Sequence, residues 1–554
     1  MTLGRRSAQR SLFGPDPFLT RRVRPDSFYG FLASQELFND DEFAELYTLD
    51  NPPKADPSVP PSLLATALLL QTFDQVSDEE TKARADFDLR WKVALGIPLD
   101  EAPFAKSTLQ LFRAQLVLHD KLQAVFKKSL DLAREKGYLK TQQGDERRKI
   151  KLALDTSYIL GRGAVKDTYN LLGDGVVSLI RVLADLARQS PATWAKAHDL
   201  ARFSDGSLSS LKGSAGIDWE DPRARKEFLS GIVKDADSLL EIAKATLAGY
   251  PEKSQARERL KAAASLLGQL LLQDVERSAE GAIIKQGTAK DRIVSVTDPE
   301  MRHGHKSKTK RFDGHKAAIA VDTESQLITA VEVLPGNAPD FEQALDLVKA
   351  SEANAEVEVE ETIGDCAYGD GTTRQEFADA ERKLVAKVPH QPNGHYFAKE
   401  DFQIDPRAST CVCPAGQTCT VLVKLGGKRG RRGKAAESLG FRFKSEQCAE
   451  CPLRSQCVRA KSGQGRTVSL HPQEALRQEA KAFQRSAAFA PYRKLRQVAE
   501  HRIARLIQLG MRQARYFGRA KTKGQLLLTA MVANLTLVAR ALGLIGPARR
   551  AATG

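Results

Sequence analysis

Three acidic residues in the sequence have the types and surroundings of a metal-dependent catalytic site. Asp155 follows an apolar run in RKIKLALDTSYI, Asp365 ends EVEVEETIGD, and Glu500 lies in the helical segment PYRKLRQVAEHRIARL. Two divalent cations held by such carboxylates can activate an attacking oxygen and stabilise a leaving oxygen in phosphoryl transfer. We therefore expect two Mg²⁺ ions here, with Mn²⁺ able to substitute. A single aspartate after a strand is more often a turn residue, so the prediction depends on all three.

Glu500 is the most informative of the three acids. The last 64 residues contain thirteen Lys or Arg and no other acid. One alternative is an exposed ion pair within the helix, with Arg493 or Arg496, worth a few tenths of a kcal/mol. A metal ligand among phosphate-binding arginines accounts for both the acid and its basic surroundings, and we favour this interpretation.

The basic residues around Glu500 are typical of a nucleic-acid contact. The whole chain has a net charge of +15 and a pI of about 9.4, which favours an anionic partner. Basic side chains with interleaved aromatics suit phosphate contact and stacking, although a solvated basic face is the alternative. The residues predicted to contact DNA are Tyr492, Arg493, Arg496, Arg512, Arg515, Tyr516 and Lys521.

Four cysteines have the spacing of a second kind of metal site. Cys413, Cys448, Cys451 and Cys457 give C-x34-C-x2-C-x5-C, with Cys411 and Cys419 nearby but outside this pattern. They lie in a glycine-rich segment with too few apolar residues to fold alone, which predicts a structural Zn²⁺. An iron–sulfur cluster would also suit the spacing, and a loop without metal is the remaining alternative.

The elements that must position these residues alternate between strand and helix. The run before Asp155 predicts a buried strand that this residue ends, FDGHKAAIAVD and QLITAVEVLPGN predict a hairpin, and Asp365 ends a further strand. Without two interruptions the order is strand, strand, strand, helix, strand, helix, strand, helix. This is the order of an RNase H-like core. We predict an α/β RNase H-like catalytic core with an all-α N-terminal domain, a helical insertion and a Cys-rich insertion.

The predicted domain boundaries follow changes in composition and periodicity. The N-terminal helices suit either a DNA-reading helix-turn-helix or a plain packing domain. The basic run at 426–434 is either a DNA-contacting loop or a hairpin tip. The segments are a basic flexible arm (1–38), the helical N-terminal domain (39–140), the first part of the core (148–393) with a helical insertion at about 168–290, the Cys-rich insertion (394–466), the second part of the core with the Glu500 helix (467–546) and a tail (547–554).

Composition excludes several classes of protein. With 42% apolar and 28% charged residues, the chain is too hydrophobic to be disordered. The longest apolar stretch, QLLLTAMVANLTLVARALGLIG, contains Asn534 and Arg540, which indicates a buried helix rather than a membrane span. No apolar segment follows the N-terminal arginines as a secretory signal requires. We therefore expect a cytoplasmic, nucleoid-associated protein without a membrane partner.

Several of these blocks resemble one known family. The stretch from SVPPSLLATALLL to FRAQL is similar to its N-terminal domain, and TDPEMRHGHKSKTKRFDGHKAAIAVD, VLPGNAPD, IGDCAYGDG and EHRIARLIQLGMRQARYFGRAKTKGQ are similar to its catalytic blocks. The family is the DDE transposases of bacterial insertion sequences, in the superfamily of insertion sequence 4 and nearest to the group numbered 1182. The resemblance implies that Asp155, Asp365 and Glu500 form the triad that binds two Mg²⁺ ions.

The resemblance also implies an activity and its partners. The protein would bind double-stranded DNA at terminal inverted repeats, cleave it hydrolytically, and join the 3′ hydroxyls to target DNA as a homodimer or larger assembly. The chain departs from one signature of the family. In the family, the sequence around the Glu is Tyr, two residues, Arg, three residues, Glu, six residues, Lys. Here Tyr492 is one residue early and Ile507 stands at the Lys position. A nuclease of the same fold without strand transfer, and an inactive DNA-binding descendant, are the alternatives.

Overall fold

A computed structural model gives the fold of the chain. The residues that it describes are 3–6, 21–47, 58–143, 146–204, 210–307, 309–390, 392–425, 438–459 and 463–546. The predicted tail, the basic run at 426–434 and residues 7–20 of the predicted arm lie outside the described residues.

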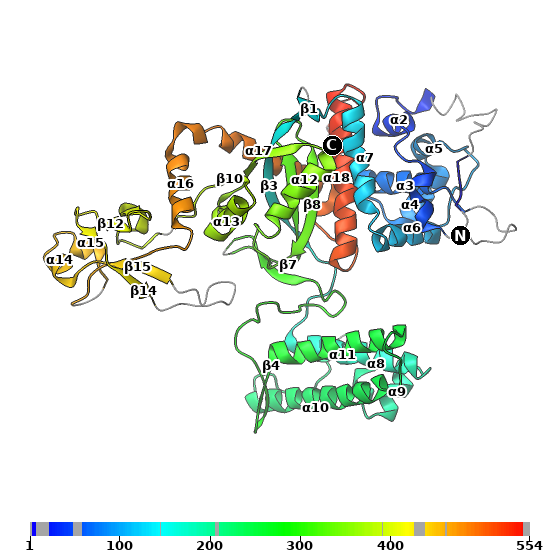
Figure 1. Cartoon of the computed structure of the whole chain (residues 1–554). Helices are drawn as coiled ribbons and strands as arrows, with labels where there is room; N and C mark the ends of the chain where they lie inside the picture. The colour runs from blue at the N-terminus through cyan, green and yellow to red at the C-terminus, as the bar shows by residue number, and fades with distance from the viewer. Residues whose placement is uncertain are drawn as a thin grey trace, which may run out of the picture.

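A mixed β-sheet lies at the centre of the molecule (Figure 1). The strands of this sheet and the helices that connect them are β3 (Lys149–Leu160), β6 (Arg302–His305), β7 (Arg311–Asp322), β8 (Ile328–Pro335), α12 (Ala344–Ala355), β9 (Glu358–Ile363), η3 (Cys366–Gly369), α13 (Gly371–Asp379) and β10 (Lys383–Val385). Strand β3 pairs with the antiparallel β7 on one side and with the parallel β9 on the other. β8 and β6 both pair antiparallel with β7, and β10 pairs parallel with β9. Along the chain, strands and helices follow the predicted order except for β6, an additional strand that the sequence analysis did not predict.

Strand β3 is longer than the sequence analysis predicts. The strand was expected to end at Asp155, but it continues to Leu160 and stays paired with β7 as far as Leu160 opposite Gly314. The prediction was wrong because it took the carboxylate as the end of the run. The following residues, Thr156, Tyr158 and Ile159 among them, are β-branched or aromatic and favour a strand. A short hairpin, β1 (Gln142–Gln143) and β2 (Glu146–Arg147), precedes β3.

The N-terminal helices begin within the predicted arm. Residues 1–38 were expected to be flexible, but Phe28 and Phe31 of the first described helix are buried, and Phe28 stacks on Phe73 at 4.2 Å between ring centroids. The Ser27 side chain caps this helix by accepting the Gly30 N–H. Burial of these aromatic side chains stabilises the helix despite the prolines and glycines nearby. The helices are α2 (Phe28–Ala33), η1 (Asp40–Leu46), α3 (Pro61–Asp74), α4 (Asp78–Phe87), α5 (Leu89–Leu95), α6 (Lys106–Leu118) and α7 (Leu122–Glu135).

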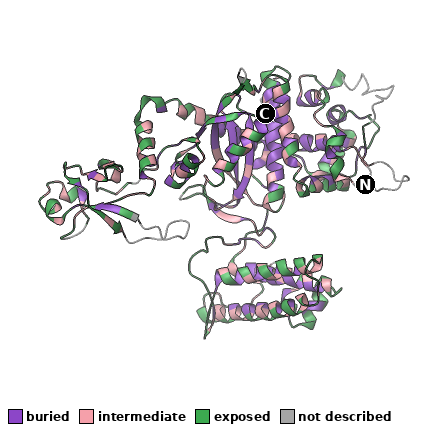
Figure 2. Cartoon of the chain, viewed as in Figure 1, coloured by how far each residue is buried: buried purple, intermediate pink, exposed green. Residues whose placement is uncertain are grey.

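One C-terminal helix joins the N-terminal helices to the sheet. The elements after residue 470 are α16 (Glu474–Arg485), η5 (Ala487–Phe489), α17 (Tyr492–Leu506), the π-helical turn η6 (Ile507–Met511) and α18 (Arg519–Ala541). Helix α18 packs against α7, α3 and β8, and Figure 2 shows it buried beside the sheet. It is long and apolar enough to cross a membrane by length and composition, but 83% of its most apolar window is buried inside the protein. A single hydrophobic core runs from the N-terminal helices through α18 to the sheet.

Two further units extend from the sheet, each with its own core. The helical unit leaves after β3 and returns before β6, and it contains α8 (Thr168–Leu186), α9 (Pro191–Ala197), η2 (Ala201–Phe203), α10 (Pro222–Leu247), α11 (Gln255–Asp274), β4 (Val275–Ser278) and β5 (Gly281–Ile284). The Cys unit (residues 392–469) lies between β10 and α16. It contains η4 (Lys399–Asp401), β11 (Gln403–Asp405), β12 (Thr410–Val412), β13 (Thr418–Cys419), β14 (Leu422–Leu425), β15 (Ser438–Arg442), α14 (Ser445–Ala449), α15 (Arg454–Cys457) and β16 (Thr467–Ser469).

Asn534 fixes α18 to the sheet, which leads to a first prediction. Its buried side chain accepts the Ile328 N–H at 2.9 Å, and donates to the Ile328 carbonyl at 2.8 Å and to Ser129 Oγ at 3.3 Å. Asn534→Ala leaves these buried groups unpaired and should lower the free energy of unfolding by about 2–4 kcal/mol. Thr536 is the control, because its hydroxyl donates only within its own helix. Thr536→Val should lower the free energy of unfolding by less than about 1 kcal/mol. Equal losses in the two variants would contradict the role of Asn534 in fixing α18 to the sheet.

Candidate active site

The strand register places Asp155 and Asp365 side by side. In the parallel pair of β3 and β9, the last paired residues are Ala153 and Ile363. Asp155 and Asp365 are each two residues beyond that pair. Residues in equivalent positions of neighbouring parallel strands lie close together, because such strands are about 4.8 Å apart. Both carboxylates therefore stand at the same end of the parallel pair, although β3 itself continues with β7.

Burial and neighbouring charge both act on Asp155. Burial is the largest cause that raises its pKa, from 3.8 to about 6, and the negative charges of Asp365 and Glu500 add to the rise. Two opposing contacts limit it: the Thr156 N–H donates to Asp155 Oδ1 at 2.8 Å, and the charge of Arg496 lowers the pKa. Asp155, Asp365 and Glu500 thus lie within electrostatic reach of one another, as the sequence analysis expects of them.

Asp365 begins a short turn of helix and has a fourth acid beside it. Its Oδ1 accepts the Ala367 N–H at 2.8 Å, which caps η3 and fixes the carboxylate. Burial raises the pKa of Asp365, and the charge of Asp340 raises it further while that of Arg496 lowers it. Asp340 in turn accepts from Lys316 Nζ at 2.7 Å. A lysine thereby compensates the additional negative charge next to the site.

Glu500 makes the helical ion pair that the sequence analysis weighed as the alternative. Arg496 Nη2 lies 2.6 Å from Glu500 Oε1 on the same helix, and the Glu500 side chain is 46% exposed. The same two residues also act on Asp155, since both charges shift its pKa. The ion pair and proximity to the aspartates therefore coexist. Arg496 is the cation shared by all three carboxylates.

The donor set fits hard divalent cations. Carboxylate oxygens are the ligands that Mg²⁺ prefers, and Mg²⁺ is commonly held by one or two carboxylates together with substrate phosphates. As the side chains stand, no three His, Cys, Asp or Glu in the described part of the chain lie close enough to hold one ion. Asp155 and Asp365 have the donor atoms for such a pair, whereas Glu500 is paired with Arg496.

Two residues beside the carboxylates were missed by the sequence analysis. Tyr368 is 1% exposed, its hydroxyl has no hydrogen-bond partner, and the charges of Asp155, Asp340 and Asp365 all raise its pKa, after burial itself. Asp340 lies in the segment before α12, which begins at Ala344. Both lie in blocks that carried the family resemblance, VLPGNAPD and IGDCAYGDG. That was the available signal.

Several residues predicted to contact DNA have partners within the chain instead. The Tyr492 hydroxyl donates to the buried Glu361 at 2.7 Å. The Arg512 guanidinium stacks on Tyr158, 3.8 Å from the ring centroid, and donates to the Tyr158 carbonyl at 2.8 Å. Arg512 thus fastens η6 to the end of β3. Some residues that periodicity places on a basic surface therefore also make contacts that hold elements of the fold together.

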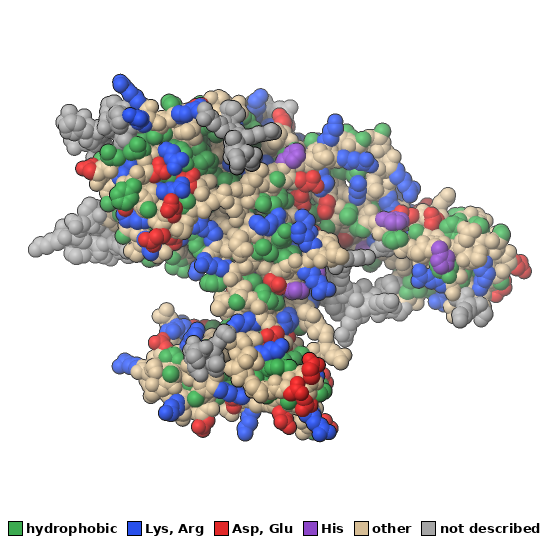
Figure 3. Space-filling view, turned by 180° about the vertical axis from the view of Figure 1, so that it is seen from behind, with side chains coloured by type: hydrophobic (Ala, Val, Ile, Leu, Met, Phe, Trp, Pro, Cys, Tyr) green, Lys and Arg blue, Asp and Glu red, His purple; other side chains and the backbone are tan. Residues whose placement is uncertain are grey.

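The remaining predicted DNA contacts divide in the same way. Arg515 donates to the Val76 carbonyl at 2.6 Å, and Tyr516 lies under the guanidinium of Arg113, so both join the C-terminal segment to the N-terminal helices. Arg493 and Lys521 are exposed. On the face shown in Figure 3, basic side chains are spread among acidic ones over all parts of the molecule. Charge alone therefore does not mark a single nucleic-acid surface there.

The pKa of Asp155 gives a prediction about stability. Between pH 4 and 6 the folded chain keeps a proton that the unfolded chain has lost, so the stabilisation contributed by Asp155 decreases as the pH rises through this range. Asp155→Asn removes the cost of the buried charge. In EDTA at pH 7.5, the Asp155→Asn variant should melt at a higher temperature than the wild type. Its free energy of unfolding should be higher by up to about 3 kcal/mol, and this difference should decrease toward pH 4.

A matched change elsewhere controls for the loss of a charge. Asp346 is exposed in the first turn of α12, and Asp346→Asn should shift stability by less than about 0.5 kcal/mol at either pH. Identical melting curves for Asp155→Asn and the wild type at both pH values would contradict the burial of this carboxylate.

Comparison with protein families identifies two regions of the chain. Residues 412–539 match the model described as a transposase DDE domain, and residues 19–115 match a transposase domain (DUF772). The first match includes the Cys unit from Val412 onward, the helix of Glu500 and most of α18; the second runs from α2 into α6. No curated protein and no solved structure matches the chain. Two regions of the chain are therefore similar to transposase domains, and one of them is similar to a DDE domain, a class that has an RNase H-like α/β core.

Proposed function

We propose that the protein is a DNA transposase of a bacterial insertion sequence, in the superfamily of insertion sequence 4 and near the group numbered 1182. It binds the terminal inverted repeats, cleaves the ends hydrolytically and joins the 3′ hydroxyls to target DNA. Asp155, Asp365 and Glu500 are its catalytic carboxylates. The observation that carries the proposal is the strand register, which brings Asp155 and Asp365 to the same end of the β3 and β9 pair, where the charge of Glu500 also reaches Asp155.

The residues of the site divide the work of binding and orientation. Two Mg²⁺ ions, when bound, supply activation of the attacking oxygen and stabilisation of the leaving oxygen. Asp155 and Asp365 each use Oδ1 to accept a backbone N–H, so each carboxylate is held in one orientation with Oδ2 available as a ligand. Glu500, now paired with Arg496, would serve as the third metal ligand. Arg496 is then available for a DNA phosphate.

DNA is proposed to lie across the carboxylates and along the exposed side of α17. Arg493 and Arg496 are on the helix that presents Glu500, and Lys521 is in the first turn of α18. The helical N-terminal domain supplies a second DNA contact in this proposal. Because two ends must be brought together, the active complex is a homodimer or larger.

The catalytic assignment predicts the effect of three substitutions. Asp155→Asn, Asp365→Asn and Glu500→Gln should each lower Mg²⁺-dependent cleavage of end DNA by about 1,000-fold or more, because each removes a metal ligand. Binding of the same DNA should remain within a few-fold of the wild type. The DNA is an oligonucleotide with the inverted repeat that flanks the gene, and cleavage is measured on a denaturing gel.

Glu479→Gln is the matched control for these variants. Glu479 is exposed on α16, so the same loss of charge there should leave cleavage unchanged. Full cleavage by any of the three variants would remove that residue from the triad. Joining of the cleaved ends to a plasmid target separates a transposase from a nuclease, which would cut without joining. No cleavage by the wild type would favour the inactive DNA-binding alternative.

The exposed basic residues predict a change in the salt dependence of binding. Arg493→Gln with Lys521→Gln should weaken binding to all DNA sequences alike. The slope of log affinity against log salt should fall by about 2, near 0.9 for each lost phosphate contact. Lys253→Gln in the helical unit, also exposed, is the control and should change neither quantity. An unchanged slope in the double variant would place the DNA on another face.

A further inference from the structure

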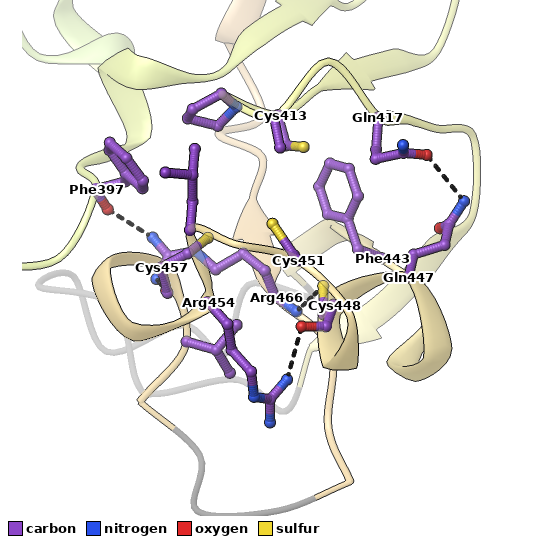
Figure 4. Close-up of a pocket in the computed structure, with 14 residues that line it drawn as sticks. Phe397, Cys413, Gln417, Phe443, Gln447, Cys448, Cys451, Arg454, Cys457 and Arg466 are labelled. Atoms are coloured by element: carbon purple, nitrogen blue, oxygen red, sulfur yellow. Dashed lines mark hydrogen bonds between the residues drawn. The ribbon is translucent and has the colours of Figure 1, made fainter.

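The cysteines of the Cys unit separate into two groups in space. Cys413, Cys448, Cys451 and Cys457 line one pocket, and Figure 4 shows their sulfur atoms on its walls. The other two cysteines are directly opposite one another on β12 and β13. Of these, Cys411 is fully buried and Cys419 donates its S–H to the Arg442 carbonyl at 3.2 Å. The four pocket cysteines are those of the C-x34-C-x2-C-x5-C pattern.

The chain around the pocket has the turns that a metal site needs. The Cys413 N–H donates to the Gln417 carbonyl and the Gly416 N–H to the Cys413 carbonyl, both at 2.9 Å, so CPAGQ forms a tight turn. Gly416 has φ 78°, a left-handed conformation that favours glycine. On the opposite wall, Cys448 is the last but one residue of α14, and Cys451 follows three residues later. The cavity between these walls is about 20 Å³, room for one guest the size of a water molecule.

Hydrogen-bond donors and two arginine side chains border the pocket. The Arg466 N–H donates to Cys448 Sγ at 3.4 Å, a contact that stabilises a charged sulfur. Arg466 also donates to the Cys457 carbonyl at 2.9 Å, and Arg454 donates to the Cys448 carbonyl at 3.1 Å. Arg466 Nε is buried without a hydrogen-bond partner. Two arginines therefore line the pocket, enough to offset the double negative charge of a divalent ion bound by four thiolates.

The Cys unit has only a small apolar core. Its seven fully buried core residues include three cysteines, so few large apolar side chains remain. Among the described residues, no three cysteine sulfurs lie close enough together to hold one metal ion. A bound ion would draw the CPAGQ turn, α14 and α15 together at one point, which is how structural zinc stabilises small units.

We propose that Cys413, Cys448, Cys451 and Cys457 bind one structural Zn²⁺. The tetrahedral site ties together the unit that separates β10 from α16. Its effect reaches the helices beyond, because Lys399 of the Cys unit forms a buried ion pair with Glu474 of α16 at 2.5 Å. The Zn²⁺ does not take part in DNA cleavage. It holds the segment that leads into the Glu500 helix.

Metal analysis of the full-length protein tests the site independently of transposition. Protein expressed with zinc and purified without chelating resins should contain about one zinc per chain. Cys413→Ser and Cys451→Ser should each reduce this to near zero. Cys419→Ser and Cys366→Ser should keep the full zinc content, because one sulfur faces a carbonyl and the other lies beside Asp365. Equal zinc in Cys451→Ser and the wild type would overturn the proposal.

Two measurements on the unaltered chain keep the test valid if a variant fails to fold. Titration with an organomercurial reagent should release the zinc, detected with a chromogenic chelator, as thiols are consumed. Cobalt exchanged into the protein should show the visible absorption of a tetrahedral thiolate complex. Iron with acid-labile sulfide, or a chain that takes up neither zinc nor cobalt, would overturn the proposal.

Discussion

The central strand β3 has two neighbours that run in opposite directions, and most of the structure depends on that arrangement. Its antiparallel pairing with β7 extends to Leu160, whereas its parallel pairing with β9 ends at Ala153. Asp155 therefore lies where one neighbour has stopped and the other continues. The chain that leaves β9 turns immediately, and Asp365 caps that turn. A carboxylate within a strand and another that caps the turn after a strand thus lie at the same end of the parallel pair.

Burial and neighbouring negative charges act on the carboxylates of the site, and nearby cations compensate them. Burial raises the pKa values of Asp155 and Asp365, so the ionised pair is held at a cost in free energy that a divalent ion would offset. Arg496 supplies part of this compensation from α17, in contact with Glu500. Lys316 does the same for Asp340 on the other side. The neighbourhood is balanced by side chains that can exchange partners when ions and phosphates arrive.

The order of strands and helices could be predicted from the sequence because each core strand has a local pattern. The position of Asp365 after a strand could also be predicted from the residues next to it. The extension of β3 was not, since it depends on pairing with β7, more than 150 residues away in the chain. Arg512 looked like a DNA contact for the same reason: its partner Tyr158 is 354 residues distant. The first helix was hidden by prolines and glycines, although its aromatic residues pack on α3.

The placement of α18 has a consequence for the synthesis of the protein. This helix completes a core that begins at Val23 and includes the N-terminal helices and the sheet. Residues 519–541 are synthesised after α7 and β8, so the apolar faces of those two elements have no partner until α18 has left the ribosome. At about 5–20 residues per second, this interval lasts for tens of seconds. Nascent chains are therefore exposed to chaperones and proteases until the final helix docks, and a ribosome that stalls before α18 releases a product without a closed core.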